Sequence, residues 1–207
     1  LAEGRNTLQE LYSHTGFSRA KISVYLKSLM ELELVEKVFS FDTEGHANTK
    51  KGYYRIKSHL VDFYYRFVYP HASDAELLNG KAFYEKYIEK DFRAFVDVHF
   101  KEICREYMEG ENTAGKLPFA LTKIGEWIGK QGCVDIVGST EGENCLIGAC
   151  FFMPMVTYEL YEELLLAAKQ AKIAYSYIYL FGIDRFDGKL LLEARVKKNI
   201  RLVNLGE

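Results

Sequence analysis

One carboxylate stands inside an otherwise apolar pair of predicted strands. Asp135 lies in the segment CVDIVGS, residues 133–139, and the strand that follows, CLIGACFFM at residues 145–153, carries no charge. A carboxylate on one strand, with an acid and a lysine two residues apart on the next, is an arrangement that binds Mg²⁺ for phosphodiester hydrolysis. Alternate strand residues point to one face, which explains that spacing. Here the two places hold Ala149 and Phe151, so the sequence offers one ligand of such a site.

Other acids of the same region could complete a metal site in principle. Glu141 and Glu143 belong to the predicted hairpin loop TEGEN, which puts them at the wrong end of the strands. Glu126, in the preceding segment KIGEWIG, is the remaining candidate. A lone Asp135 does not make a tight Mg²⁺ site, because such sites need more than one oxygen ligand. We therefore expect no metal ligand and no catalytic residue in this chain, with a divergent Mg²⁺-dependent DNA nuclease that uses Asp135 as the alternative.

The four cysteines lie within apolar runs and none forms a C-x-x-C pair. A zinc site built from Cys133, Cys145 and Cys150 is an alternative, but the usual ligand spacing is absent. Small buried thiols, kept reduced in a cytoplasmic protein, explain the pattern better. No apolar run approaches the length of a membrane span, and we expect neither a signal peptide nor a membrane partner.

Residues 1–57 show the order helix, glycine turn, helix, two-stranded ribbon, which is typical of a winged helix-turn-helix. TLQELYSHTG predicts a first helix that ends at Gly16, and Ser18 is the expected N-cap of the second. In the second helix the inward stripe at i, i+4 and i+7 consists of Ile22, Leu26 and Leu29. The ribbon strands are LVEKVFSF and GYYRI.

In a winged helix the second helix enters a major groove and the hairpin loop touches the DNA backbone. The candidate DNA contacts are Arg19, Lys21 and Lys27 on the helix, with Lys50 and Lys51 in the loop. The competing interpretation is a solvated face on a module that packs against a protein partner, because strong DNA binders usually carry a larger basic patch. The net charge of the whole chain is −2, which indicates no general attraction to nucleic acid.

Residues 58–80 are predicted to form a connecting helix and loop. The helix has an apolar, aromatic-rich side, ends at Pro70 and is followed by a polar loop. Its aromatic residues could stack on nucleobases, but their helical spacing favours a buried connector. The side chains expected on its inner side are Leu60, Phe63, Tyr64, Phe67 and Val68.

Residues 81–207 predict a mixed α/β (α+β) domain. A helical region comes first, with one stripe expected at Phe92, Val96, Phe100, Ile103 and Tyr107. Three strands, an amphipathic helix at TYELYEELLLAAKQAK, a buried strand at AYSYIYLFGI, a short helix at LLLEARVKK and a last strand at IRLVNL follow. This order predicts a mixed sheet with flanking helices.

Four segments together resemble the C-terminal part of AAA-type ATPases of archaea and bacteria. They are YYRIKSHLVDFYYRFVYP (53–70), FKEICREYM (100–108), IGEWIG (124–129) and VDIVG (134–138). In that family an ATPase domain precedes a winged helix and a C-terminal domain of unknown function that resembles PD-(D/E)xK nucleases. The resemblance implies a restriction-endonuclease-like mixed sheet in residues 81–207, with a degenerate active site.

Related chains tend to carry Gly-Glu-Cys-Lys-Trp where this chain has GACFF, so the acid and the lysine are replaced and Cys150 matches. Where related nucleases often place a helical Glu, this chain has Lys101, and Glu102 comes next. Asp135 and Glu102 are thus the vestigial site candidates.

The phosphate-binding pattern G-x-x-x-x-G-K-[ST] is absent. The resemblance therefore implies that an ATPase domain lies upstream on a longer polypeptide, and that ATP and Mg²⁺ bind there. The chain itself needs no cofactor. It would act as a noncatalytic module that binds duplex DNA or a protein partner.

Overall fold

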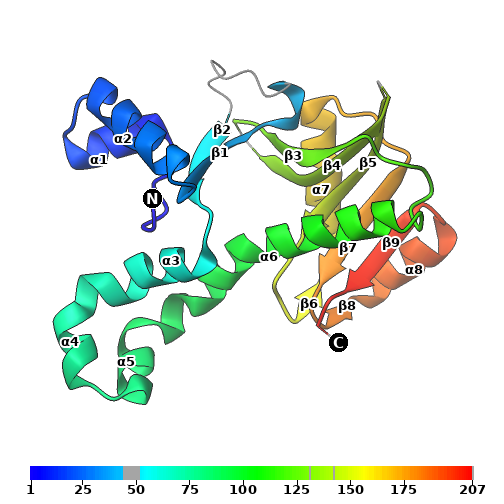
Figure 1. The fold of residues 1–207 in the computed structure, drawn as a ribbon. Helices are drawn as coiled ribbons and strands as arrows, with labels where there is room; N and C mark the ends of the chain where they lie inside the picture. The colour runs from blue at the N-terminus through cyan, green and yellow to red at the C-terminus, as the bar shows by residue number, and fades with distance from the viewer. Residues whose placement is uncertain (44–51, 131, 142, 207) are drawn as a thin grey trace. The chain divides into compact units, whose positions relative to one another are not determined.

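The computed structural model describes residues 1–43, 52–130, 132–141 and 143–206 (Figure 1). The chain forms two compact units. Among the described residues, the N-terminal unit comprises 1–39 and 52–93, and the C-terminal unit comprises 40–43 and 94–206.

The N-terminal unit begins with the predicted pair of helices. Helix α1 (Leu8–Thr15) starts at a capping box, in which Thr7 accepts a hydrogen bond from the Glu10 backbone and Glu10 accepts one from Thr7. Gly16 ends the helix in the left-handed region at φ 68°, a conformation that costs glycine little. Helix α2 (Arg19–Glu31) follows, capped by the Ser18 side chain as predicted.

An antiparallel ribbon of β1 (Val35–Phe39) and β2 (Gly52–Ile56) completes the helix-turn-helix. Ile22, Leu26 and Val35 form its buried core, and Leu29 packs against them. The inner stripe predicted for α2 is therefore confirmed, because residues at i, i+4 and i+7 meet the same neighbours.

The connector after β2 remains helical beyond Pro70, so the prediction of a helix that ends there is wrong. Helix α3 (His59–Phe63) widens into a π-helical turn, η2 (Tyr64–Val68), and tightens into a 3-10 turn, η3 (Tyr69–His71), before α4 (Ala72–Leu77). Proline donates no backbone hydrogen bond and clashes with the preceding turn. A π turn followed by a 3-10 turn accommodates it without ending the helix.

The buried side of this connector is also narrower than the spacing predicts. Phe67 is 4% exposed, whereas Leu60 is 76% and Tyr64 is 43% exposed. The three tyrosines Tyr64, Tyr65 and Tyr69 lie against one another, with ring centroids 5.3–6.2 Å apart. From Tyr64 onward, the π geometry departs from the α-helical period on which the predicted stripe depends, whereas Leu60 is exposed already on α3.

Helix α5 (Gly80–Tyr87) groups with the connector, so the contacts place residues 81–93 in the N-terminal unit. The Tyr87 ring stacks on His71, with centroids 3.8 Å apart. Asp74 accepts hydrogen bonds from the Tyr87 hydroxyl and, at 2.8 Å, from Lys86 Nζ. The sequence predicts a C-terminal domain that begins at residue 81. The contacts of α5 with α4 and η3 instead group residues 81–93 with the N-terminal unit.

The C-terminal unit is built on a five-stranded mixed sheet of order β3-β4-β5-β7-β9. The strands β3 (Lys123–Ile128), β4 (Cys133–Thr140) and β5 (Glu143–Cys150) are antiparallel, while β7 (Tyr177–Gly182) and β9 (Ile200–Asn204) run parallel to β5. A short parallel pair, β6 (Met155–Val156) and β8 (Arg185–Phe186), stands beside it. The predicted mixed α/β class is confirmed.

Helices cover both faces of this sheet (Figure 1). On one face, α7 (Tyr158–Ala171) and α8 (Gly188–Val196) bury Tyr161, Leu164 and Leu190 against the sheet. On the other face lies α6 (Glu89–Thr113), whose residues from 94 onward belong to this unit. Successive residues of β7 alternate between the faces, with Leu180 under α7 and Phe181 under α6.

The buried stripe of α6 consists of Phe100, Cys104 and Met108. The predicted stripe shares Phe100 with it, but Ile103 is exposed and Tyr107 lies only at its margin. The prediction favoured the larger apolar side chains. The residues that pack on the sheet are instead the i, i+4, i+8 series Phe100, Cys104 and Met108, which includes a small cysteine.

The segment after β1 belongs to the C-terminal unit, where it covers the edge strand β3. Buried Ser40 accepts a hydrogen bond from the Ile128 backbone at 2.9 Å, and Lys123 Nζ donates to the Phe41 carbonyl at 2.7 Å. The 3-10 turn η1 (Phe41–Thr43) thus satisfies part of an open sheet edge, which would otherwise invite pairing with another strand. Among the described residues, no helix has the length and apolar character to cross a membrane.

Candidate functional site

Asp135 lies where β4 and β5 separate. The paired register of the two strands reaches Ile136 opposite Gly148, and Asp135 lies just beyond it. One oxygen, Oδ2, accepts a hydrogen bond from the Cys150 backbone N–H at 3.0 Å. The other, Oδ1, is 2.6 Å from the Lys101 ammonium on α6. The carboxylate therefore connects its own strand to a neighbouring strand and to a helix.

This ion pair is mostly sheltered from solvent. The Asp135 side chain is 10% exposed and that of Lys101 is 36% exposed. Burial lowers the pKa of Lys101, but the Asp135 charge and the hydrogen bond between them outweigh it, so the pKa lies well above its usual value. Lys101 thus stays protonated throughout the physiological range. Burial first, and then the Asp135 charge, raise the pKa of the Cys133 thiol, whose Sγ is 3.6 Å from Oδ1.

The two strand positions that would complete a nuclease site do not lie around Asp135. Ala149 and Phe151 share a face, as strand alternation predicts, but they pack in the apolar cluster under α7. Asp135 instead meets Lys101, which projects from α6. A site for Mg²⁺ needs several oxygen ligands, and an ammonium at 2.6 Å supplies positive charge in place of a ligand. The residues present therefore do not fit the metal site that the nuclease resemblance implies.

The site contains a second carboxylate, that of Asp97 on α6, which was not predicted from the sequence. Asp97 Oδ1 accepts a hydrogen bond from the Phe152 backbone at 3.1 Å. It precedes Lys101 by four residues, so the two side chains lie on one side of the helix. Together they hold the end of β5 from Cys150 to Phe152. The i, i+4 spacing in the sequence predicts that the two side chains share a side of the helix, but it does not identify the strand that they contact.

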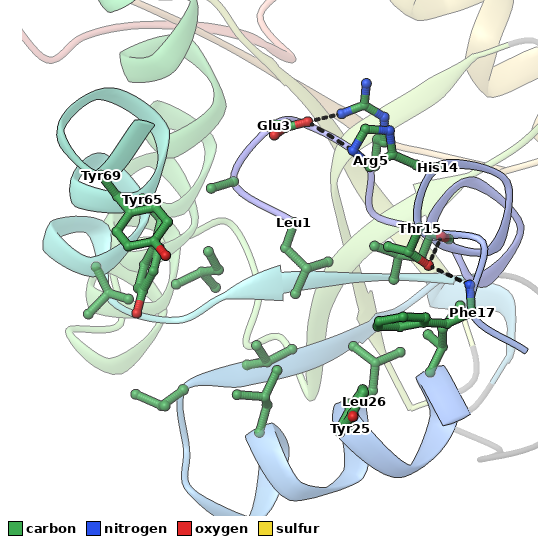
Figure 2. A pocket seen from close by; sticks show the side chains of 18 of the residues that line it. Leu1, Glu3, Arg5, His14, Thr15, Phe17, Tyr25, Leu26, Tyr65 and Tyr69 are labelled. Atoms are coloured by element: carbon green, nitrogen blue, oxygen red, sulfur yellow. Dashed lines mark hydrogen bonds and ion pairs between the residues drawn. The ribbon is translucent and has the colours of Figure 1, made fainter. Parts of the chain in front are cut away.

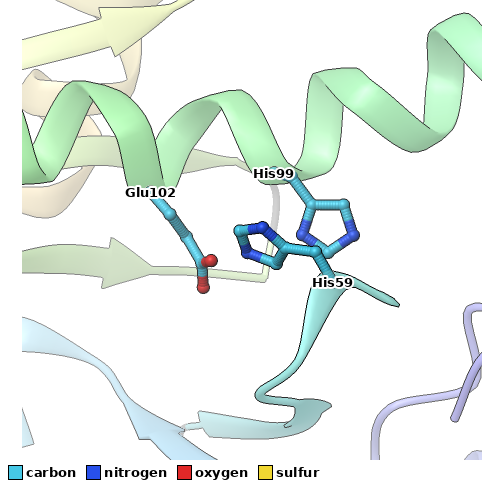
Figure 3. A group of neighbouring side chains, drawn as sticks. All are labelled: His59, His99 and Glu102. Carbon is cyan, nitrogen blue, oxygen red and sulfur yellow. The ribbon is translucent and has the colours of Figure 1, made fainter. Parts of the chain in front are cut away.

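Glu102, the second vestigial candidate, lies beside His99 on α6 (Figure 3). A ligand atom of each lies within 4.8 Å of the other. His59, also drawn there, belongs to the N-terminal unit. Among the described residues, no group of three potential metal ligands includes Asp135, Glu126 or a cysteine.

The described cysteine side chains are free thiols. Cys104 and Cys150 are buried, and burial, followed by a hydrogen bond with Cys104, raises the pKa of Cys150 well above its usual value. Cys133 is exposed, and its Sγ lies beside Asp135. The zinc alternative also includes Cys145, whose side chain lies outside the described part of the chain.

The exposed side of α2 carries the predicted DNA contacts. Arg19 donates to Gln9 and lies 5.3 Å from the Tyr12 ring centre. Lys21 Nζ lies 3.9 Å above the centre of the Phe17 ring. Lys27 and Glu31 form an exposed ion pair at 3.8 Å, which is worth little in water. Figure 1 shows α2 and the ribbon of β1 and β2, while Lys50 and Lys51 of the loop between the strands lie outside the described residues.

An open cavity of about 640 Å³ lies within the N-terminal unit (Figure 2). It is lined by the winged-helix core residues Ile22, Leu26 and Val35, and also by Phe17 and Tyr65. Figure 2 shows Glu3 and Arg5, which form an ion pair, on the segment before α1. The cavity is mainly apolar and adjoins the inner face of α2.

Two family models match separate parts of the chain. Residues 1–37 match a model described as bacterial regulatory protein, arsR family, and residues 64–159 match one described as archaea bacterial proteins of unknown function. The first match agrees with the helix-turn-helix, and the second shows that residues 64–159 are similar to proteins of unknown function.

One curated relative is an uncharacterized protein of Methanocaldococcus jannaschii. It is 30% identical over 144 residues, which are 70% of this chain and 32% of the relative. The aligned part of the chain thus spans about a third of that relative's length. No solved structure matches the chain.

Proposed function

We propose that this chain is a noncatalytic DNA-binding module of a larger AAA-type ATPase. The observation that carries the proposal is the helix-turn-helix in which α2 presents Arg19, Lys21 and Lys27 on an exposed side. The match of residues 1–37 to a family of bacterial regulators supports it. In this interpretation α2 enters the major groove of duplex DNA and the loop with Lys50 and Lys51 contacts the backbone.

The contacts of these cations within the protein leave them available to phosphate. The Lys27–Glu31 pair joins two side chains that are 75% and 65% exposed, and such pairs exchange readily for a stronger anion. Lys21 lies over aromatic rings, which orient an ammonium without neutralising it. Helix α2 begins directly after its N-cap Ser18, so Arg19 and Lys21 lie in the first turn. The positive end of the helix dipole is also there.

The C-terminal unit would support binding without cleaving DNA. The charge of Asp135 is already neutralised by Lys101, and the sequence lacks the acid and lysine of a nuclease strand. The upstream ATPase domain, which the family resemblance implies, would bind ATP and Mg²⁺ and couple its nucleotide state to this module. Free thiols in the described residues agree with a cytoplasmic setting.

A binding titration tests the proposal directly. The 207-residue chain is added to a short fluorescent DNA duplex, and anisotropy is recorded from about 50 mM to 200 mM salt. We expect binding that needs no metal and weakens steeply with salt, because phosphate contacts release counterions. Lys21→Ala with Lys27→Ala should weaken it. Lys81→Ala is the matched control, since Lys81 forms the same kind of exposed pair with Glu85 at 3.8 Å on α5.

Two results would contradict the proposal in different ways. No binding at low salt would leave a protein partner as the ligand of the exposed side of α2. Cleavage of the duplex with Mg²⁺ or Mn²⁺, lost in Asp135→Ala, would establish the divergent nuclease instead. An intact duplex after prolonged incubation with either metal is the result that we expect.

A further inference from the structure

The Asp135 carboxylate is held by a cation that belongs to the chain. Lys101 Nζ lies 2.6 Å from Oδ1, and the Cys150 N–H lies 3.0 Å from Oδ2. Both oxygens therefore have a donor, one charged and one neutral. Since the Asp135 side chain is only 10% exposed, water contributes little to balancing its charge.

Helix α6, which carries Lys101, is also held at the end of β5. Asp97, one turn earlier on α6, accepts the Phe152 N–H at 3.1 Å. Phe100 and Cys104, which flank Lys101 along α6, are buried against the sheet. The side chain at position 101 is consequently directed at Asp135 by packing on both sides of it.

We infer that Lys101 is a tethered substitute for a divalent cation at Asp135, so that the residue at position 101 decides whether this end of the sheet takes a metal ion. With lysine, the ammonium lies where a metal ion would have to sit and the pair is neutral overall, so a divalent cation gains no net attraction there. With an acid at the same place, two sheltered carboxylates would face each other, and a divalent ion would be their natural counter-charge. This inference is independent of DNA binding.

Charge reversal at position 101 tests the inference in the full 207-residue chain. Thermal unfolding is followed by tryptophan fluorescence, because Trp127 on β3 is the sole tryptophan of the sequence and reports on the C-terminal unit. Lys101→Glu should lower the unfolding temperature by about 5 °C or more, as two close carboxylates repel in a sheltered site. Millimolar Mn²⁺ should restore most of that loss.

Three control proteins isolate the site. Wild type should show no Mn²⁺-dependent shift, because Lys101 occupies the position. Lys101→Glu with Asp135→Asn should lose the response, because one of the two carboxylates is gone. Lys197→Glu reverses a lysine that pairs with Glu193 at 2.7 Å on α8, where the Lys197 side chain is 53% exposed, so its Mn²⁺ shift should stay within about 1 °C.

Two outcomes would overturn the inference. One is a Mn²⁺-dependent rise in wild type that Asp135→Asn abolishes, because the metal would then bind despite the ammonium. The other is a folded Lys101→Glu protein that ignores Mn²⁺. If that variant does not fold, its refolding from urea with and without Mn²⁺ gives the same answer, and recovery only with Mn²⁺ supports the inference.

A thermodynamic cycle of milder variants provides a second measurement. Lys101→Met and Asp135→Asn should each lower the unfolding temperature, and the double variant should lose less than the sum of the two. A strictly additive result would show that the ammonium does not balance the carboxylate, and it would overturn the inference.

Discussion

The Asp135 carboxylate of the C-terminal unit and the α2 lysines of the N-terminal unit lie in opposite environments. In the C-terminal unit, Asp135 is sheltered and both of its oxygens have donors within the protein. In the N-terminal unit, Lys21 and Lys27 are exposed, with partners that solvent screens. A charge satisfied inside the fold contributes to stability, whereas a charge left at the surface remains available for a ligand. The comparison supports the proposal that α2 binds the ligand. It gives the Asp135 carboxylate a structural role.

The largest expected effect comes from removing the sheltered carboxylate. Asp135→Ala should destabilise the C-terminal unit by about 3 kcal/mol. This is the low end of the range for breaking a buried ion pair, because the Lys101 side chain is 36% exposed. Urea unfolding followed by Trp127 fluorescence measures this. DNA affinity at a temperature where the variant is folded should not change. A large loss of affinity with intact folding would break the comparison, since it would make Asp135 part of the binding surface.

The reciprocal change concerns the exposed lysines of α2. Lys21→Ala and Lys27→Ala together should reduce duplex affinity about tenfold and lower the salt slope by about 2, one for each phosphate contact. Stability should shift by less than about 0.5 kcal/mol, as surface substitutions usually do. Parallel anisotropy titrations and urea unfolding followed by circular dichroism measure both quantities. Lys81→Ala on α5 should leave affinity and slope unchanged.

A pair of glycines permits the same substitution in each unit. Gly16, after α1, and Gly115, after α6, have φ of 68° and 67°, and an added Cβ would meet no atom within 4 Å at either. The cost of alanine is therefore conformational, about 1 kcal/mol at each position. Gly115→Ala should lower only the Trp127 transition. Gly16→Ala should lower stability and also weaken DNA binding, because Gly16 sets the turn between α1 and α2. An unchanged affinity would argue against this role of Gly16.

Local features of the fold could be read from the sequence because they depend on neighbours in the chain. The end of α1 at Gly16, the Ser18 cap and the alternating strands follow from residue type and period alone. The path after Pro70 could not be read, since a π turn next to a 3-10 turn has no sequence period. The stripe of α6 was partly misassigned because the sheet, and not residue size, selects Cys104 and Met108.

The candidate site shows where prediction from sequence ends. Asp135 was identified from its place in an apolar strand, and Ala149 and Phe151 were rightly paired on one face. Which face that is depends on how α7 and α6 cover the sheet, and this is a tertiary property. Lys101 is 34 residues from Asp135, and Asp97 is 55 residues from Phe152. No local spacing reveals contacts of that range, so the ion pair emerged only in the structure.

The smallest predicted effect tests whether the cations of α2 are truly available. Glu31→Gln removes the carboxylate 3.8 Å from Lys27 without changing the shape of the side chain. If α2 contacts phosphate, affinity should rise about two- to threefold, because an exposed i, i+4 pair is worth only a few tenths of a kcal/mol and Glu31 also repels DNA. The gain should vanish at high salt. Glu85→Gln, beside Lys81 on α5, is the matched control and should have no effect. An equal gain in affinity from both substitutions would show that only the net charge matters and that α2 does not contact the DNA specifically.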